Sequence, residues 1–310
     1  MQWYHILLII IAIIFILMFI IYLAFIDTFT NKKRLHSVLS NDTPYAKYID
    51  IIKKNKEYFD TVEDEEVYIE SFDGLKLKAL YVNSGNSNKL LIFFHGFKSS
   101  YKTDLTNAKS YVDKGYSLLM IEQRAHGDSE GKYITFGVKE RYDALSWCEY
   151  AVNRFGSSVE IVMVGVSMGA STIMMASDLN LPKQVKGMIC DCGFNTPKDE
   201  IAYCIKHYYH LPSKILVNIL DLYCRVFAKF SLAGASSSKS LENSTIPILM
   251  IHGDGDDFVP YQYSLENFAS CKMDNKELLT IKCDVHAASY LEEMELYNEK
   301  VSKFLNSINF

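Results

Sequence analysis

Residues 165–169, Gly-Val-Ser-Met-Gly, set a serine between two glycines, after an apolar run and before a helical pattern. A serine on a sharp strand-to-helix turn projects its hydroxyl above a sheet, and the glycines leave room for nearby backbone. The first amides of the helix that follows can face a developing negative charge. The spacing predicts Ser167 as a nucleophile, with Gly165 and Gly169 as the glycines of the turn. A glycine-rich turn without chemistry is the weaker alternative.

A serine hydroxyl becomes nucleophilic when a base accepts its proton and a carboxylate orients that base. His286 is the candidate base, because it alone among the histidines follows the last expected strand and precedes the C-terminal helix. Three aspartates follow the penultimate strand and are candidate acids: Asp254, Asp256 and Asp257. A calcium loop is excluded there, because Phe258 occupies a position where an EF-hand needs an oxygen ligand.

Several segments over about residues 65 to 305 resemble the bacterial α/β-hydrolases of the serine-aminopeptidase and lipase-like group. They are His95-Gly96-Phe97, residues 122–129 (Glu-Gln-Arg-Ala-His-Gly-Asp-Ser), the serine turn, His252-Gly253-x-x-Asp256-x-x-Val259-Pro260 and residues 286–290 (His-Ala-Ala-Ser-Tyr). The resemblance implies Asp256 as the acid, with Asp254 and Asp257 as loop hydrogen-bonding residues. It also implies an oxyanion hole made by the backbone amides of Phe97 and Met168.

The same resemblance implies supporting roles for other polar residues near the predicted site. His95 is expected to hold its own loop, and Arg124 and His126 to order the segment that contains them rather than form a second catalytic set. The sequence departs from the family pattern at two places: Glu122 replaces the common aspartate, and residues 283–285 before the histidine lack the usual small residues. These departures affect the inference about the substrate more than the assignment of the triad. No metal or organic cofactor is expected.

Short apolar runs alternate with helical patterns, which is typical of a parallel sheet covered on both faces. We expect an α/β-hydrolase fold with a mostly parallel eight-stranded sheet that begins with a hairpin at Asp73-Gly74. The expected strands are 67–72, 75–82, 90–94, 117–121, 159–164, 187–189, 246–251 and 278–281. The expected helices are 104–114, 138–155, 170–179, 261–271 and 288–305.

One long interval, about residues 195–245, separates two of these strands. It contains helical stretches at 198–209 and 214–230 and a polar loop at 235–243. Long insertions at the carboxyl edge of an α/β sheet usually cover the active site. We interpret this interval as a lid.

Residues 6–26 contain no charge, glycine or proline, and as a helix they would span about 30 Å, the thickness of the bilayer hydrocarbon. This predicts an uncleaved transmembrane anchor over residues 1–30. A cleaved signal peptide is the alternative, but no basic residue precedes the run and no small-residue cleavage site ends it. Lys32, Lys33 and Arg34 favour a cytoplasmic catalytic domain by the positive-inside rule, although tethered hydrolases are often drawn facing outward. A polar connecting segment is expected at 31–62 and the hydrolase domain at 63–310.

Composition excludes some classes of partner and site. The formal net charge is −5, and no basic cluster with interleaved aromatics is present, so we expect no nucleic-acid binding. The seven cysteines are odd in number and scattered, which does not indicate a disulfide framework. Cys190 and Cys192 are separated by one residue, which is not the spacing of a zinc or redox pair.

These features predict hydrolysis of a carboxylic ester or related acyl bond through an acyl-enzyme. The expected partners are a small or lipid-like acyl substrate and the membrane. A serine peptidase or an acyl-thioesterase on the same triad is the alternative within this scaffold, because a fold does not fix the acyl partner. A non-catalytic membrane-bound binding module is the alternative from another class, and the filled triad positions argue against it.

Overall fold

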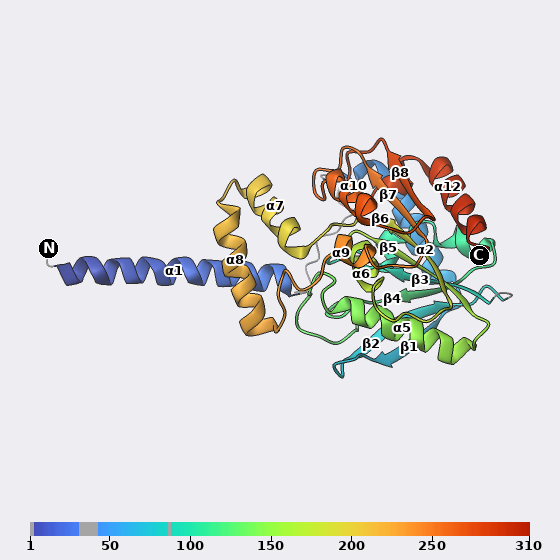
Figure 1. Ribbon diagram of the computed structural model, residues 1–310, viewed down its shortest axis with the longest axis horizontal. Helices are drawn as coiled ribbons and strands as arrows, with labels where there is room; N and C mark the ends of the chain where they lie inside the picture. The colour runs from blue at the N-terminus through green and yellow to red at the C-terminus, as the bar shows by residue number, and fades with distance from the viewer. Residues whose placement is uncertain (1–2, 31–42, 86–87) are drawn as a thin grey trace.

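The computed structural model describes residues 3–30, 43–85 and 88–310. At its centre lies an eight-stranded sheet with the order β1-β2-β4-β3-β5-β6-β7-β8 (Figure 1). The strands are β1 Glu65–Glu70, β2 Lys76–Val82, β3 Lys89–Phe94, β4 Ser117–Ile121, β5 Glu160–Val166, β6 Val185–Asp191, β7 Ile248–Gly253 and β8 Lys276–Ile281. All eight coincide with expected strands, with ends that differ by a few residues.

The sheet is antiparallel at one edge and parallel elsewhere. β1 pairs with β2, and β2 with β4, in antiparallel register, whereas every pair from β4 to β8 is parallel. Gly74 lies at the tip of the β1–β2 hairpin with φ +83°, a conformation that glycine adopts without strain. The predicted hairpin and the mostly parallel sheet are therefore confirmed.

Helices cover both faces of the sheet, which is why the central strands are apolar on both sides. The helices are α1 Trp3–Phe29, η1 Ala46–Tyr48, α2 Ile49–Thr61, α3 Tyr101–Asp104, α4 Ala108–Asp113, α5 Glu140–Phe155, α6 Met168–Ala176, α7 Pro197–Tyr209, α8 Ser213–Tyr223, the π-helical turn η2 Cys224–Ala228, α9 Ser237–Leu241, α10 Tyr261–Ser270, α11 Ser289–Glu292 and α12 Met294–Ser307. One core packs α2 and α12 on the sheet, and Ile52 and Phe304 are buried there. The other core packs α5 and α6 on the opposite face around Trp147 and Ile173.

Three sequence predictions of local structure are wrong in detail. The helix expected at 104–114 is two short helices, because Leu105 leaves the helical conformation (ψ 67°) beside Asp104, whose carboxylate bonds to the Gly96 amide. The helix expected at 288–305 is interrupted at Glu293, where φ is −130° and ψ is 61°. The polar loop expected at 235–243 contains α9, whose first turn is capped by the Ser236 hydroxyl.

Both segments that precede the sheet are packed against the rest of the protein. η1 and α2, within the expected connecting segment, contribute Tyr48, Ile52 and Phe59 to the core. Near the end of α1, Phe25 and Phe29 are fully buried in a cluster that includes residues of α8 and η2. Among the described residues α1 is the one helix long and apolar enough to cross a membrane. The basic residues at 32–34, used above for orientation, lie outside the described residues.

Candidate active site

Ser167 lies on the tight turn between β5 and α6. Its backbone has φ 53° and ψ −116°, a strained conformation for a residue with a side chain. A Cβ added to Gly169 would lie 2.0 Å from the carbonyl oxygen of Phe94, and one added to Gly165 would lie 2.5 Å from the carbonyl carbon of Gly169. The turn is therefore possible only because both flanking positions are glycine.

Three residues from three separate loops meet at this turn. His286, in the loop after β8, places Nε2 2.8 Å from the Ser167 hydroxyl oxygen. Its Nδ1 lies 2.7 Å from Oδ2 of Asp256, in the loop after β7. The geometry brings together Ser167, His286 and Asp256, the nucleophile, base and acid expected from the sequence. This arrangement can pass a proton from a serine hydroxyl to an imidazole that a carboxylate orients.

The Asp256 carboxylate is held by more than the predicted base. Its Oδ1 accepts hydrogen bonds of 3.0 Å from the amides of Phe258 and Val259. His252 is fully buried and places Nε2 3.3 Å from Oδ2. Burial alone would raise the pKa of Asp256, but the hydrogen bonds with His252 and His286 outweigh burial and hold that pKa well below the usual range. The carboxylate is therefore charged at neutral pH.

His252 belongs to the segment His252-Gly253-x-x-Asp256 that carries the family resemblance, but no supporting role was expected for it. Its Nε2–H donates to the Val259 carbonyl at 2.9 Å, and the Ser264 hydroxyl lies 2.6 Å from Nδ1. These contacts fix the ring edge-on to Asp256. The signal available in the sequence was its position four residues before Asp256, at the end of β7.

The loop after β3 contributes the residue expected to complete the oxyanion site. Gly96 lies against Ser167, because a Cβ added there would be 3.5 Å from the Ser167 Cβ. The Gly96 amide donates a 2.6 Å hydrogen bond to the carboxylate of Asp104, which also accepts from the Ser99 hydroxyl. Phe97 follows directly. The half-buried Asp104 therefore orders this loop. Its role was not visible in the sequence, because its partners depend on the break between α3 and α4.

Residues 85–223 match the family model described as serine aminopeptidase, S33. The esterase Pf2001 of Pyrococcus furiosus superposes with a TM-score of 0.64 at 24% identity, over 87% of this chain and 97% of that chain. The chain has the α/β-hydrolase fold. Its resemblance to the serine-aminopeptidase and lipase-like group is confirmed.

Other proteins that resemble this chain span most of its length. The protein YqkD of Bacillus subtilis (strain 168) is 27% identical over 267 residues, which are 84% of this chain and 87% of YqkD. The enzyme Est1E of Butyrivibrio proteoclasticus, solved with ferulic acid, superposes with a TM-score of 0.57 at 23% identity, over 78% of this chain and 98% of that chain. The acylaminoacyl peptidase of Pyrococcus horikoshii has a TM-score of 0.56 at 19% identity, and covers 81% of this chain but 43% of its own. At these identities the structural matches establish the fold.

The other histidines near the hydrolase site lie in its supporting loops. His95 is fully buried, and burial together with nearby His126 lowers its pKa to about 3. It is therefore neutral, donates through Nδ1 to the Gly96 carbonyl and accepts at Nε2 from the Gln123 amide. His126 accepts from the Lys98 amide at 3.1 Å. These contacts order the loops around Ser167 and do not reach the hydroxyl.

Arg124 forms a buried ion-pair network beneath the same loops. It bonds Asp143 at 2.6 and 2.7 Å and Asp73, at the hairpin tip, at 3.0 Å. Such contacts tie the hairpin to α5. Asp254 and Asp257 are both exposed, and the Asp257 carbonyl accepts hydrogen bonds from Tyr203 and Tyr208 of α7.

One group of side chains at the site has the composition of a metal centre. Ligand atoms of Cys192, Asp256 and His286 lie within 4.8 Å of one another. Burial raises the pKa of the Cys192 thiol well above its usual value, so the thiolate that a metal requires is disfavoured. The His286 and Asp256 atoms already bond to each other. These residues fit a hydrogen-bonded triad better than a metal site.

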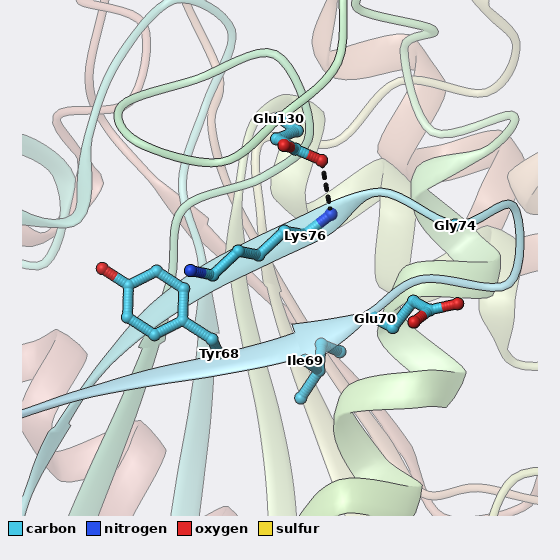
Figure 2. A pocket seen from close by; sticks show the side chains of 6 residues that line it. All are labelled: Tyr68, Ile69, Glu70, Gly74, Lys76 and Glu130. Atoms are coloured by element: carbon cyan, nitrogen blue, oxygen red, sulfur yellow. Dashed lines mark hydrogen bonds between the residues drawn. The ribbon is translucent and has the colours of Figure 1, made fainter.

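A separate hollow of about 280 Å³ lies on the β1–β2 hairpin (Figure 2). It is lined by Tyr68, Ile69, Glu70, Gly74, Lys76 and Glu130. The Lys76 amide donates to the Glu130 carboxylate across it at 2.8 Å. The hollow is open, contains no nucleophile paired with a base, and belongs to strands at the far edge of the sheet from β7 and β8. It is not a candidate active site.

Proposed function

We propose that this α/β-hydrolase is a serine hydrolase that cleaves carboxylic esters or related acyl bonds through an acyl-enzyme. The observation that carries the proposal is the continuous chain of contacts from Ser167 through His286 to Asp256, at 2.8 and 2.7 Å. A nucleophile, a base and an orienting carboxylate in hydrogen-bond contact are the parts that serine acyl transfer requires.

Three side chains and two backbone amides have separate roles in the proposed reaction. The Asp256 carboxylate accepts a hydrogen bond from Nδ1–H of His286 and fixes the tautomer in which Nε2 is free. Nε2 then accepts the proton of the Ser167 hydroxyl as its oxygen attacks the acyl carbon. The amides of Phe97 and Met168 stabilise the oxyanion of the tetrahedral intermediate. His286 returns the proton to the leaving group, and the acyl group stays on Ser167. Water, activated by the same histidine, then releases the acid.

The surroundings of Ser167 favour an apolar acyl group. The fully buried Met168 belongs to an apolar cluster with Phe136, Phe194 and Val259, and the ring of Phe97 stacks on that of Phe136 at a centroid distance of 4.8 Å. Aromatic and aliphatic walls with few polar groups suit an acyl chain or an aromatic acid. The esterase neighbours are consistent with this substrate class.

We further propose that α1 anchors the enzyme in a membrane and that lipid-like esters are among its substrates. The first part of the 27-residue helix is apolar, and its most hydrophobic stretch is not covered by the rest of the protein. The basic residues at 32–34 favour a cytoplasmic catalytic domain. Protease treatment of intact cells tests this side, because a cytoplasmic domain stays uncut until the cells are opened.

A substrate panel tests the function. Purified full-length protein is assayed with p-nitrophenyl esters of increasing chain length and with aminoacyl p-nitroanilides, and Ser167→Ala serves as the control. We expect ester hydrolysis that the control lacks. Faster cleavage of the anilides would favour the peptidase that the S33 family description suggests, and equal activity in the control would refute the proposal.

A further inference from the structure

The lid is attached to α1 well before the end of that helix. The hydroxyl of Tyr223, the last residue of α8, donates a 2.9 Å hydrogen bond to the Met18 carbonyl. Its ring meets that of Tyr22 edge to face at 6.0 Å, and Phe227 lies 5.4 Å from the same ring. Figure 1 shows α8 crossing α1, which continues beyond it toward the N-terminus. The contact therefore fixes the position of the lid along the axis of α1.

The contact at Met18 lies within the apolar run of residues 6–26. Met18 precedes Ile26, the last residue of the uncharged run, by eight residues, or about 12 Å of helix at 1.5 Å per residue. A hydrocarbon layer about 30 Å thick needs about 20 apolar residues, so residues 6–26 have none to spare. If this run fills the layer, the end of α8 that touches Met18 lies below the membrane surface.

The exposed side of the lid suits that position. Ile215 and Leu222 are 63% and 52% exposed, and with Val226 they follow the spacing of one helix face. Leu211 and Phe227 extend this apolar surface and are also exposed. The long cationic side chains that flank it, Lys214, Arg225 and Lys229, are exposed as well. Lysine and arginine beside an interfacial helix extend their charges to the headgroups while their stems stay in the apolar layer.

The charge of the lid also differs from that of the chain. Residues 197–230 carry five lysines and arginines against three acidic residues, in a protein whose net charge is −5. Glu200 and Asp221, two of the three acidic residues, are buried. The exposed lid is therefore cationic, as a surface that contacts anionic headgroups should be.

We propose that the lid face formed by Leu211, Ile215, Leu222, Val226 and Phe227 inserts into the lipid leaflet that α1 crosses, so that ester substrates reach Ser167 from the bilayer. This rests on the proposed function, both for the membrane anchor and for the ester substrate. The end of α1 also joins the lid to the oxyanion loop. The ring of Phe29 lies 5.9 Å from that of Phe230 in the lid and 5.5 Å from that of Phe136, which stacks on Phe97. The anchor is thus part of the substrate-binding region as well as a tether.

Tryptophan depth measurements test the insertion directly. The chain has two tryptophans, and Trp147 is fully buried in the domain core, so Trp3→Phe gives a background with one buried indole. In that background Ile215→Trp and Leu222→Trp report on the lid. Leu296→Trp, at a 43% exposed position of α12, is the matched control. Each full-length protein is reconstituted in vesicles of phosphatidylcholine and phosphatidylglycerol that contain lipids brominated along the acyl chain.

We expect the bromolipids to quench the indoles at 215 and 222 strongly and the indole at 296 weakly. Equal quenching at all three sites overturns the proposal. Chemical cross-linking through Lys214 that shows a second copy of the chain covering the lid overturns it as well. Flotation with the vesicles and fluorophosphonate labelling are measured on the same samples. Protein that does not float refutes the anchor, and protein that is not labelled refutes the serine hydrolase. Protein that floats and is labelled, but whose lid indoles are not quenched, refutes only the insertion.

An activity comparison adds a second readout. Ile215→Glu combined with Leu222→Glu should lower hydrolysis of a long-chain ester presented in vesicles about tenfold, which corresponds to about 1.4 kcal/mol of lost interfacial binding. Hydrolysis of a water-soluble short-chain ester should stay unchanged. The control Leu296→Glu should alter neither rate. An equal loss on both substrates, or no loss on the vesicle substrate, contradicts the proposal.

Discussion

The Tyr45 hydroxyl donates a 2.7 Å hydrogen bond to the backbone carbonyl of His286. Tyr45 precedes η1, in the segment between the N-terminal helix and the sheet, and His286 lies 241 residues later in the loop after β8. The contact holds the loop of the proposed base. The segment that was expected only to connect two parts of the chain therefore helps to shape the site.

We predict that Tyr45→Phe lowers kcat about fivefold with little change in KM, because the loss of one hydrogen bond of about 1 kcal/mol loosens the histidine loop. Steady-state kinetics on a soluble ester measure the effect. Tyr58→Phe is the matched control, since the hydroxyl of Tyr58, in α2, has no hydrogen-bond partner among the described residues. A change in KM with kcat unchanged, or an equal loss of kcat in Tyr58→Phe, would contradict the positioning role.

Removal of the proposed base or acid should abolish most of the chemistry. We expect His286→Ala and Asp256→Asn each to lower kcat about 10⁴-fold, because the nucleophile then lacks a correctly oriented proton acceptor. Asp254→Asn should retain wild-type kinetics, since Asp254 is exposed and, among the described residues, its hydrogen bond runs from the backbone amide to the Ile281 carbonyl. If Asp254→Asn were the variant that lost activity, the assignment of the acid would be wrong.

Gly169→Ala should prevent correct folding or reduce the free energy of unfolding by more than about 3 kcal/mol, because its Cβ would overlap the carbonyl of Phe94 on β3. Thermal unfolding and expression yield measure the loss. Gly156→Ala is the comparison: its φ is also positive, +86°, but the space beside it is open. That change should reduce stability by about 1–2 kcal/mol. Similar effects at both positions would mean that the close approach at Gly169 is unimportant.

Asp191 should make stability fall as pH rises. Burial raises its pKa to about 7, above the value near 4 of an unfolded aspartate, so the folded state binds the proton more tightly. Its contribution is therefore complete below about pH 4 and is lost as pH rises through 7. Urea unfolding in detergent from pH 5 to 8 should show wild type losing stability relative to Asp191→Asn. Parallel curves would contradict the raised pKa.

Features of the fold that depend on local pattern could be predicted from the sequence. The strands are short apolar runs, and the turn around Ser167 needs glycines that few other contexts require, so both are visible in the order of residues. The orders of the proposed serine, acid and histidine follow from the positions of their strands. The breaks at Leu105 and Glu293 were not visible, because the residues around them retain a helical pattern and tertiary contacts decide the outcome.

The residues that support the site could not be found in the same way. Asp104 and Tyr45 act through backbone groups of distant loops, and neither has a distinctive neighbour in sequence. The packing of α1 on α8 was also not visible in the sequence, since a helix that is apolar all round shows no preferred face. Only the three-dimensional arrangement shows that Phe25 and Phe29 are buried while the first part of the same helix is exposed.

Active-site labelling tests the central claim most directly. Full-length protein in detergent is treated with a fluorophosphonate probe, digested, and analysed by mass spectrometry to locate the adduct. We predict a single adduct on Ser167, absent from Ser167→Ala and strongly reduced in His286→Ala. An unlabelled wild-type protein, or labelling of Ser167→Ala to the same extent, would contradict the serine-hydrolase account.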